Sequence, residues 1–154
     1  KTTLKNLTGF MLKYYGNVYQ SPYSYNNKFG VPVSLSNLKK KTDYGIFEIG
    51  MDKKGEIDSL SKIVKPRIGV ITNISEAHIK NFKNLKGIAK AKGEIINNIV
   101  SGGDLILNKD EKFYNFFNKV ANKKKINIIS FSAKKKADIF LNRIEKKKKK
   151  IIEQ

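Results

Sequence analysis

The sequence contains no cysteine and no tryptophan, and it has only three prolines and one histidine. Without cysteine the chain can form neither disulfides nor thiolate metal sites, which fits a reducing compartment. It lacks an apolar run of the ~18 residues that a transmembrane helix needs, and no apolar segment follows Lys1 as it would in a signal peptide. We therefore expect a cytoplasmic protein that does not enter a membrane.

Acidic residues are also scarce. Only 13 Asp and Glu stand against 32 Lys and Arg, which gives a formal net charge of +19. This charge fits either a nucleic-acid surface or lysine-rich solvated faces. Arg67 and Arg143 are the only arginines, so bidentate contacts to phosphates would be few. We favour solvated faces and expect no specific nucleic-acid partner.

Two apolar stretches predict buried strands, and each leads to a residue suited to chemistry. Residues 44–50 carry Glu48, and residues 67–74 lead to His78, with a helix from about Glu56 between them. Ligands of open parallel α/β sheets bind outside the carboxyl ends of the strands. A right-handed crossover brings such ends to one edge, so we expect Glu48 and His78 to face a shared crevice.

The rest of the chain alternates helical and strand patterns, which predicts an α/β fold with a mostly parallel sheet flanked by helices. The first helix should carry an apolar stripe that includes Leu7 and Met11. Later helices should begin near Val31 and near Gly87, and a further helix should contain Phe117. Further strands are expected at 17–20, 105–108, 126–131 and 137–144.

Lys92 occupies an unusual position in the helix expected over residues 87–100. Ile88, Ile95 and Ile96 form an apolar stripe at helical spacing, and Lys92 falls within it. Burying an ammonium is costly unless the group is paired or loses its proton. Either the side chain extends past the stripe to water, or it is held near neutral for chemistry; the spacing alone leaves both open.

Two further segments have both a structural and a functional interpretation. Lys1-Thr2-Thr3 entering a helix matches the end of a phosphate loop, whose lysine reaches the terminal phosphates and whose hydroxyl binds Mg²⁺. Three residues are a weak signal. Asn26 and Asn27 precede the helix near Val31, and on sequence chemistry alone they are best explained as turn and cap residues.

Taken together, these segments resemble the ATP-dependent Mur ligases in the right order along the chain. The matching segments are 1–3, 25–32, 48–51, 55–57, 71–78, 87–95 and 107–110. Asn-Asn-x-x-Gly-Val-Pro and Glu-x-Gly-Met favour the branch that adds D-alanyl-D-alanine to UDP-N-acetylmuramoyl-tripeptide. One departure is Tyr23-Ser24, where many relatives have Gly-Asn, so this loop is expected to differ in shape.

The resemblance implies a P-loop NTPase-like central domain that is truncated. Residues 1–136 would form part of the ATP-binding domain without the glycines of its phosphate loop, and residues 137–154 would begin the next strand segment with a lysine-rich end. The implied reaction phosphorylates the peptide carboxylate with ATP to an acyl phosphate, which the dipeptide amine then attacks. The full-length enzyme would be a monomer, and this chain alone would be inactive.

The resemblance also implies roles for the residues that match its motifs. Lys1 would hold the terminal phosphates, and Thr2 and Glu48 would bind Mg²⁺. His78 would help to bind a second Mg²⁺. Lys92 matches a lysine that is carbamylated by CO₂ in the family and would then serve as an anionic metal ligand or phosphate-orienting group. This would fit its apolar setting, because only a depressed pKa supplies free amine. Lys1, His78 and Lys92 would be the catalytic residues.

The remaining roles implied by the resemblance concern the substrates. Asn26 and Asn27 would contact the peptide carboxylate or the phosphates. The nucleotide would be lined by Thr3, Asn73, Asn108, Lys109 and Asp110. The alternatives are another Mur-type ligase, a folylpolyglutamate synthase or, from a different class, a basic nucleic-acid-binding domain.

Overall fold

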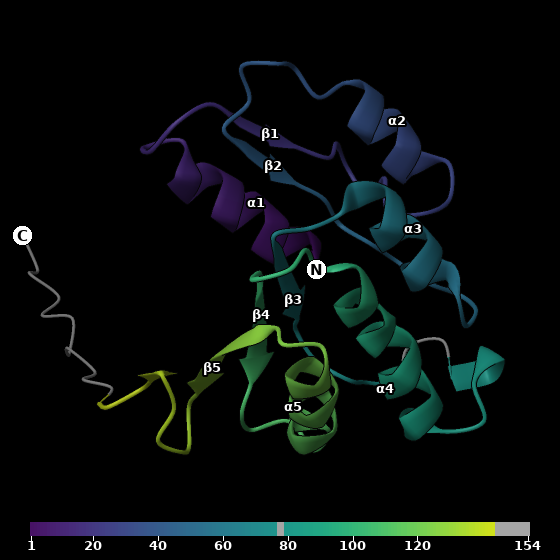
Figure 1. The fold of residues 1–154 in the computed structure, drawn as a ribbon, viewed down its shortest axis with the longest axis vertical. Helices are drawn as coiled ribbons and strands as arrows, with labels where there is room; N and C mark the ends of the chain where they lie inside the picture. The colour runs from purple at the N-terminus through teal and green to yellow at the C-terminus, as the bar shows by residue number, and fades with distance from the viewer. Residues whose placement is uncertain (77–78, 144–154) are drawn as a thin grey trace, which may run out of the picture.

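The structure is a computed structural model that describes residues 1–76 and 79–143, and it confirms a parallel α/β architecture (Figure 1). Two strands form one sheet in the order β1-β2, and four form a second in the order β3-β4-β5-β6; every strand pairing is parallel. The strands are β1 (Val18–Gln20), β2 (Tyr44–Ile46), β3 (Ile68–Ile71), β4 (Asp104–Asn108), β5 (Asn127–Ser132) and β6 (Ile139–Phe140).

Helices precede and connect the first five strands. They are α1 (Thr2–Leu12), α2 (Gly30–Ser36), α3 (Glu56–Val64), α4 (Leu85–Gly93) and α5 (Tyr114–Lys123), with short 3₁₀ helices η1 (Ile79–Asn81) and η2 (Glu94–Asn98). Helix α1 packs on β1 and β2, and α5 packs on β4 and β5. No helix in the described ranges is long and apolar enough to cross a bilayer.

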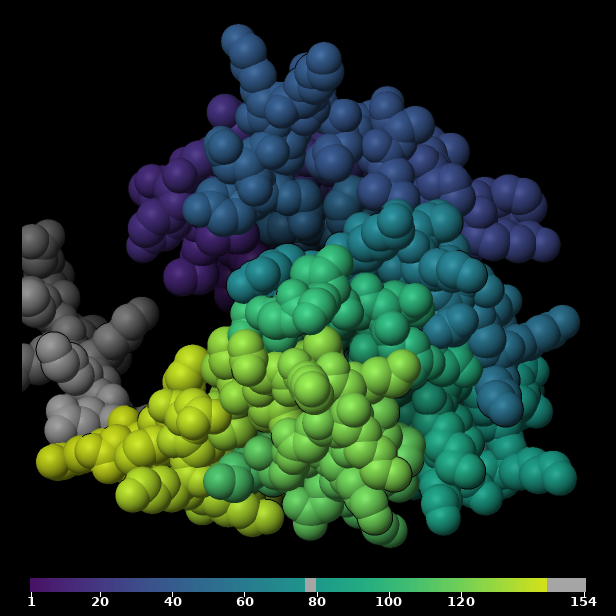
Figure 2. Space-filling view, viewed as in Figure 1, coloured from purple at the N-terminus to yellow at the C-terminus, as the bar shows by residue number. Residues whose placement is uncertain are grey.

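The strand–helix–strand unit of β2, α3 and β3 joins the two sheets rather than lying within one. β2 pairs with β1, whereas β3 pairs with β4. Figure 1 shows the chain's N-terminus in the middle of the molecule, between the β1–β2 part and the β3–β6 part. In Figure 2 the same two parts form a blue upper half and a green lower half. The start of α1 therefore lies between the two parts in this view, and the helix itself contacts the β1–β2 sheet.

The main core lies between the four-stranded sheet and the helices α4 and α5. Alternate apolar residues of β3 and β4 face it. The prediction that the first two apolar stretches form fully buried strands is wrong: β2 is largely exposed, and Ile68 and Val70 of β3 are 53% and 37% exposed, because the described helices cover only one face of this sheet. Its fully or nearly fully buried members are Ile71, Ala89, Ile96, Ile99, Leu105, Leu107, Phe117, Ala121 and Ile126. A second cluster joins α3 to α4 through Met51, Ile57, Ile88 and Ala91. The prediction that the aromatic residues of α5 pack in the core is confirmed.

The apolar stripe predicted for α1 does not face the core. Leu7 and Met11 are 57% and 59% exposed, and the buried residues of this helix are Lys5 and Gly9. The helix approaches β1 through Gly9, where even a Cβ would meet the Gln20 side chain at 2.3 Å. The face with a lysine and a glycine therefore packs inward, and the apolar stripe faces outward.

Several elements have bounds that differ from the prediction. The strand expected over 44–50 ends at Ile46, because the amide of Glu48 donates to the Ser21 hydroxyl instead of a strand carbonyl. The strand expected over 67–74 ends at Ile71. The helix expected over 87–100 starts earlier, where Asn84 accepts a cap hydrogen bond, and continues beyond Gly93 as a 3₁₀ helix.

Candidate functional site

Glu48 is the centre of the candidate site. It follows β2 by two residues, and only 6% of its surface is exposed. The Thr2 hydroxyl donates to Glu48 Oε2 at 2.8 Å, and the Asn26 amide donates to Glu48 Oε1 at 2.8 Å. The carboxylate is thus fixed on one side by α1 and on the other by the loop that precedes α2.

The surroundings of Glu48 favour its ionised form. Burial alone would raise its pKa, but the hydrogen bonds from Asn26 and Thr2 and the charge of Lys1 outweigh that effect, so the pKa lies below the usual value. Hydrogen bonds to a carboxylate and a nearby cation both stabilise the charged form. Glu48 is therefore a buried anion at neutral pH.

Asn26 and Asn27 have different roles in the structure. The Asn27 side chain accepts hydrogen bonds from the amides of Phe29 and Gly30 at the start of α2, at 3.1 and 2.9 Å. These contacts support the interpretation of Asn27 as a turn residue that satisfies amides at the start of α2, whose N-cap is Phe29. Asn26 instead contacts Glu48, and its carbonyl accepts from the Gly50 amide at 2.7 Å. Only one asparagine of the pair is directed at the candidate site.

The start of α1 brings a lysine, a hydroxyl and free amides to Glu48. Lys1 Nζ donates to the carbonyl of Ile49 at 3.3 Å. The first turn of α1 contains no acidic residue, and its cap has no side-chain hydrogen bond. The first amides of a helix have no intrahelical partner and favour anions. Beside them is a shallow hollow lined by Thr2, Thr3, Asn6, Leu7 and Phe10.

Lys92 lies partly buried on α4, and its Nζ donates to the carbonyl of Asn73, just beyond β3, at 2.7 Å. Burial lowers the pKa of Lys92, the charge of Lys1 lowers it further, and Glu111 opposes the shift. Lys1 therefore influences both Glu48 and Lys92. The charge at the start of α1 thus acts on one group near the end of β2 and on another near the end of β3, although the two strands belong to different sheets.

These groups fit a magnesium ion better than a transition metal. The Thr2 hydroxyl and the ionised Glu48 carboxylate supply hard oxygen donors. Mg²⁺ typically uses one or two carboxylates and takes its other ligands from phosphates and water. The part of the chain that the structure describes holds no cluster of three acidic or histidine side chains. His78, predicted to bind a second ion, lies outside the described residues.

The segment from Asn108 to Asp110 mainly holds the loop after β5. Asp110 accepts from the Ser132 hydroxyl and the Ala133 amide, each at 2.8 Å. Asn108 accepts from the Asp110 amide, and Lys109 Nζ donates to the carbonyl of Lys136. The predicted nucleotide contacts of Asn108 and Asp110 stay predictions, but the Asp110 carboxylate already serves the fold.

Sequence reasoning missed Lys5, the buried lysine of α1. Its Nζ donates to the carbonyls of Ser21, at 2.6 Å, and Tyr23. The only sequence signal was Gly9 four residues later, which marks a face of α1 that can approach a neighbour closely. The apolar stripe on the opposite face was the stronger pattern, and it wrongly indicated which face of α1 packs inward.

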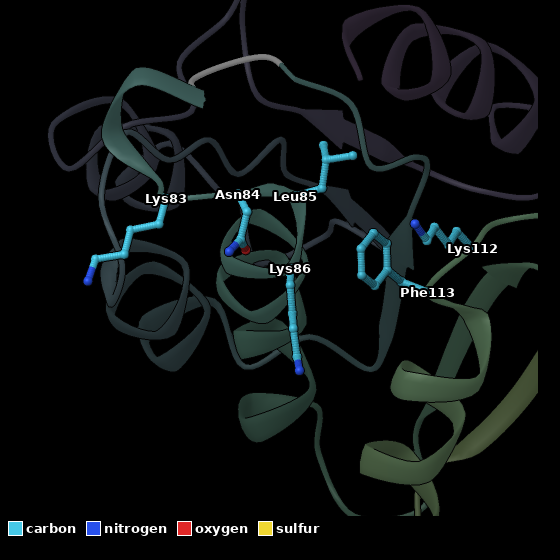
Figure 3. Close-up of a pocket in the computed structure, with 6 residues that line it drawn as sticks. All are labelled: Lys83, Asn84, Leu85, Lys86, Lys112 and Phe113. Carbon is cyan, nitrogen blue, oxygen red and sulfur yellow. The ribbon is translucent and has the colours of Figure 1, made fainter.

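A separate hollow lies between the start of α4 and the segment before α5, and Figure 3 shows the side chains around it. Phe113 lies across from Leu85, whereas the Lys83 side chain points away from both (Figure 3). The Asn84 side chain there already accepts from the Gly87 amide as the cap of α4. This hollow contains none of the predicted site residues.

Comparison with known families identifies the class of protein that this fold and site define. A sequence model of the Mur ligase middle domain matches residues 1–152. The chain belongs to the Mur ligase family.

The most similar relatives include UDP-N-acetylmuramoyl-tripeptide–D-alanyl-D-alanine ligases. The protein of that name from Buchnera aphidicola (subsp. Baizongia pistaciae) is 39% identical over 94% of this chain and 31% of its own length. The Rickettsia prowazekii protein is 38% identical over 89% of this chain and 31% of its own length. The chain thus spans about a third of these relatives.

Solved structures agree with this relationship. MurF from Acinetobacter baumannii superposes with a TM-score of 0.87 at 34% identity, over 94% of this chain and 31% of that protein. MurF from Thermotoga maritima, solved in complex with ADP, has a TM-score of 0.75 at 25% identity, over 87% of this chain and 30% of that protein. The fold expected from the sequence is therefore confirmed.

Proposed function

We propose that this chain provides nucleotide- and magnesium-binding residues of an ATP-dependent ligase. The ligase joins D-alanyl-D-alanine to UDP-N-acetylmuramoyl-tripeptide. The observation that carries the proposal is that Thr2 and Asn26 both donate to the buried carboxylate of Glu48, while Lys1 binds the carbonyl of the next residue and its charge acts on Glu48. The substrates are those that the names of the similar full-length relatives state.

In this proposal, the peptide carboxylate attacks the γ-phosphorus of ATP and ADP departs with the bridging oxygen. The dipeptide amine then attacks the carbonyl carbon of the acyl phosphate; the amide bond forms, and phosphate and a proton leave. Phosphoryl transfer of this kind depends mostly on positioning and charge neutralisation. The chain therefore needs fixed charges more than a reactive nucleophile.

The residues around Glu48 suit that requirement. Lys1 and the first amides of α1 would hold phosphate oxygens, in the way that helix N-termini bind anions. Thr2 and Glu48 would hold Mg²⁺, which when bound neutralises charge on the β- and γ-phosphates. Asn26 would keep Glu48 in place and lie next to the peptide carboxylate.

The test is ADP formation by the complete gene product. ADP should appear only when Mg²⁺, the UDP-linked tripeptide and the dipeptide are all present. Glu48→Gln keeps the shape of the side chain but removes its charge, and we expect kcat to fall by about 100-fold or more, as for other electrostatic stabilisers. Asp104→Asn makes the same chemical change at the far end of β4 and should stay within about 2-fold.

Two results would exclude this function. ADP formation that does not depend on the peptide substrates would remove the ligase assignment. Equal losses in Glu48→Gln and Asp104→Asn would remove Glu48 from the site.

We also propose that Lys92 is carbamylated. Its neutral amine would add to CO₂, forming an N–C bond and losing a proton, which leaves an anionic carbamate. Partial burial and a lowered pKa support this because they increase the fraction of free amine. Activity of the complete gene product should rise with bicarbonate, and Lys92→Met should remove that dependence together with about 100-fold of kcat.

Lys90→Met is the matched control, because Lys90 is exposed on the same helix. It should leave the bicarbonate response unchanged. Full activity of Lys92→Met, or a bicarbonate response that survives in it, would show that Lys92 carries no carbamate needed for the reaction.

A further inference from the structure

Lys5 is a buried cation that the proposed reaction does not use. It lies one turn after Lys1 on α1 and is only 5% exposed. Its recorded hydrogen bonds are to two backbone carbonyls, those of Ser21 and Tyr23. Burying an ammonium costs free energy that neutral carbonyls offset only in part. An apolar side chain would avoid that cost but would not bind the loop.

In its middle, the loop from Ser21 to Asn26 is restrained by contacts within itself, which do not tie it to α1: the Tyr25 amide donates to Pro22, the Asn26 amide donates to Ser24, and the Tyr23 and Tyr25 rings lie 6.2 Å apart. Ser21 is held against β2, because its amide donates to Ile46 and its hydroxyl accepts from the Glu48 amide. Asn26 is held by Glu48 and Gly50. Between these ends Tyr23 is 82% exposed, so apolar burial does little to fix the loop.

Tyr23 also has a backbone conformation that needs support. Its φ is +44°, in the left-handed region that residues with side chains seldom adopt. Such a conformation persists where surrounding contacts hold it. The Tyr23 carbonyl is one of the two groups that Lys5 binds. The lysine thus holds the loop at the residue where it is most strained.

We propose that Lys5 is a positioning residue: its ammonium holds the loop from Ser21 to Asn26 against α1, so that Asn26 stays hydrogen-bonded to Glu48. α1 then sets both sides of the site. Its first turn brings Lys1 and Thr2 to Glu48, and its second turn fixes the loop that carries Asn26. The kinetic consequence rests on the ligase function proposed above, whereas the structural one does not.

The structural consequence is measured by amide hydrogen exchange in the complete gene product. Lys5→Met keeps the apolar stem but removes the ammonium, and it should speed exchange of the Asn26 and Gly50 amides by about tenfold or more. Lys13→Met, an exposed lysine at the end of the same helix, should change neither amide. Lys5→Arg keeps the charge in a different shape and should give an intermediate rate.

Either Lys5 variant can test the proposal, provided that it yields folded protein. Wild-type exchange rates at Asn26 and Gly50 in a folded Lys5→Met or Lys5→Arg variant would overturn the proposal. Faster exchange over the whole chain, with no excess at this loop, would also overturn it, because Lys5 would then act on global stability alone.

The kinetic consequence is measured by a double-mutant cycle. Lys5→Met should lower kcat/KM for the UDP-linked peptide by about tenfold, and it should cause no further loss in an Asn26→Ala background, because both changes break one interaction chain. If the losses from Lys5→Met and Asn26→Ala multiply in the double variant, Lys5 does not act through Asn26. If the wild-type protein makes no ADP with these substrates, the ligase function fails, and the exchange experiment still decides the role of Lys5.

Discussion

Glu48 and Asp110 are both carboxylates that follow the carboxyl ends of parallel strands, yet they bind different kinds of partner. Glu48 accepts side-chain hydrogen bonds from Thr2 and Asn26, which are 46 and 22 residues away in the sequence. Asp110 accepts from Ser132 and Ala133, at the end of the neighbouring strand β5. Both arrangements join separate segments, but the first brings predicted site residues together, whereas the second fixes the loop after β5 to the end of β4.

The electrostatic surroundings follow the same division. The charge of Lys1 acts on both Glu48 and Lys92. The pKa of Asp110 is lowered first by its hydrogen bond from Ser132 and only weakly by nearby lysines. A carboxylate at a strand end is therefore a better site candidate when other predicted site residues bind it than when the end of a neighbouring strand does.

Among substitutions that keep both carboxylates, the largest expected effect comes from adding a methyl group beside Asn26. In Gly50→Ala the new Cβ would lie 2.9 Å from Asn26 Oδ1 and 3.0 Å from its Cγ. The side chain can move away at little cost in stability, but it then loses Glu48. We expect the ADP-forming kcat/KM of the complete gene product to fall by about 10- to 100-fold, with a small change in the urea midpoint.

Gly102→Ala should show the opposite pattern. Gly102 has a φ of +70° and open space around its Cα. An alanine there should cost roughly 1–2 kcal/mol of stability through backbone strain and leave kcat/KM unchanged. Equal effects of the two substitutions on activity would show that the contact between Asn26 and Glu48 is not important to the reaction.

The sequence predicted the fold better than the orientation of its elements. Parallel strands, the helices between them and the aromatic core of α5 all follow from local periodicity. The inward face of α1 does not, because Lys5 and Gly9 pack inward for a tertiary reason, the close approach of the helix to Gln20 and the loop beyond it. Periodicity reports how apolar a face is, not which neighbour lies against it.

The candidate site shows the same limit at the level of single residues. Asn26 and Asn27 have the same chemistry and adjacent positions, so nothing in the sequence assigns them different roles. Their different roles depend on where α2 begins and where Glu48 lies. Glu48 itself was predictable, because an acid in an apolar strand pattern is unusual. Its partners were not, since they depend on contacts across many residues.

The smallest expected effect concerns the acid stability of the Asp110 loop. The pKa of Asp110 is lowered in the folded state, chiefly by the hydrogen bond from Ser132. A carboxyl with a lowered folded pKa stabilises the protein above its unfolded value, about 4 for aspartate, and loses that contribution as the pH falls through the folded pKa. Asp110→Asn should therefore lower the urea midpoint at pH 7 but leave it nearly unchanged at pH 2.

The control and the activity assay complete this prediction. Asp104→Asn removes a carboxylate whose recorded side-chain hydrogen bond, from Asn127, is a long one of 3.4 Å, so the fall in midpoint between pH 7 and pH 2 should match that of the wild type. ADP formation at pH 7 should stay within about 3-fold in Asp110→Asn, because its carboxylate serves the loop. A loss of activity as large as that of Glu48→Gln, without a change in acid stability, would move Asp110 into the site and remove the distinction between the two carboxylates.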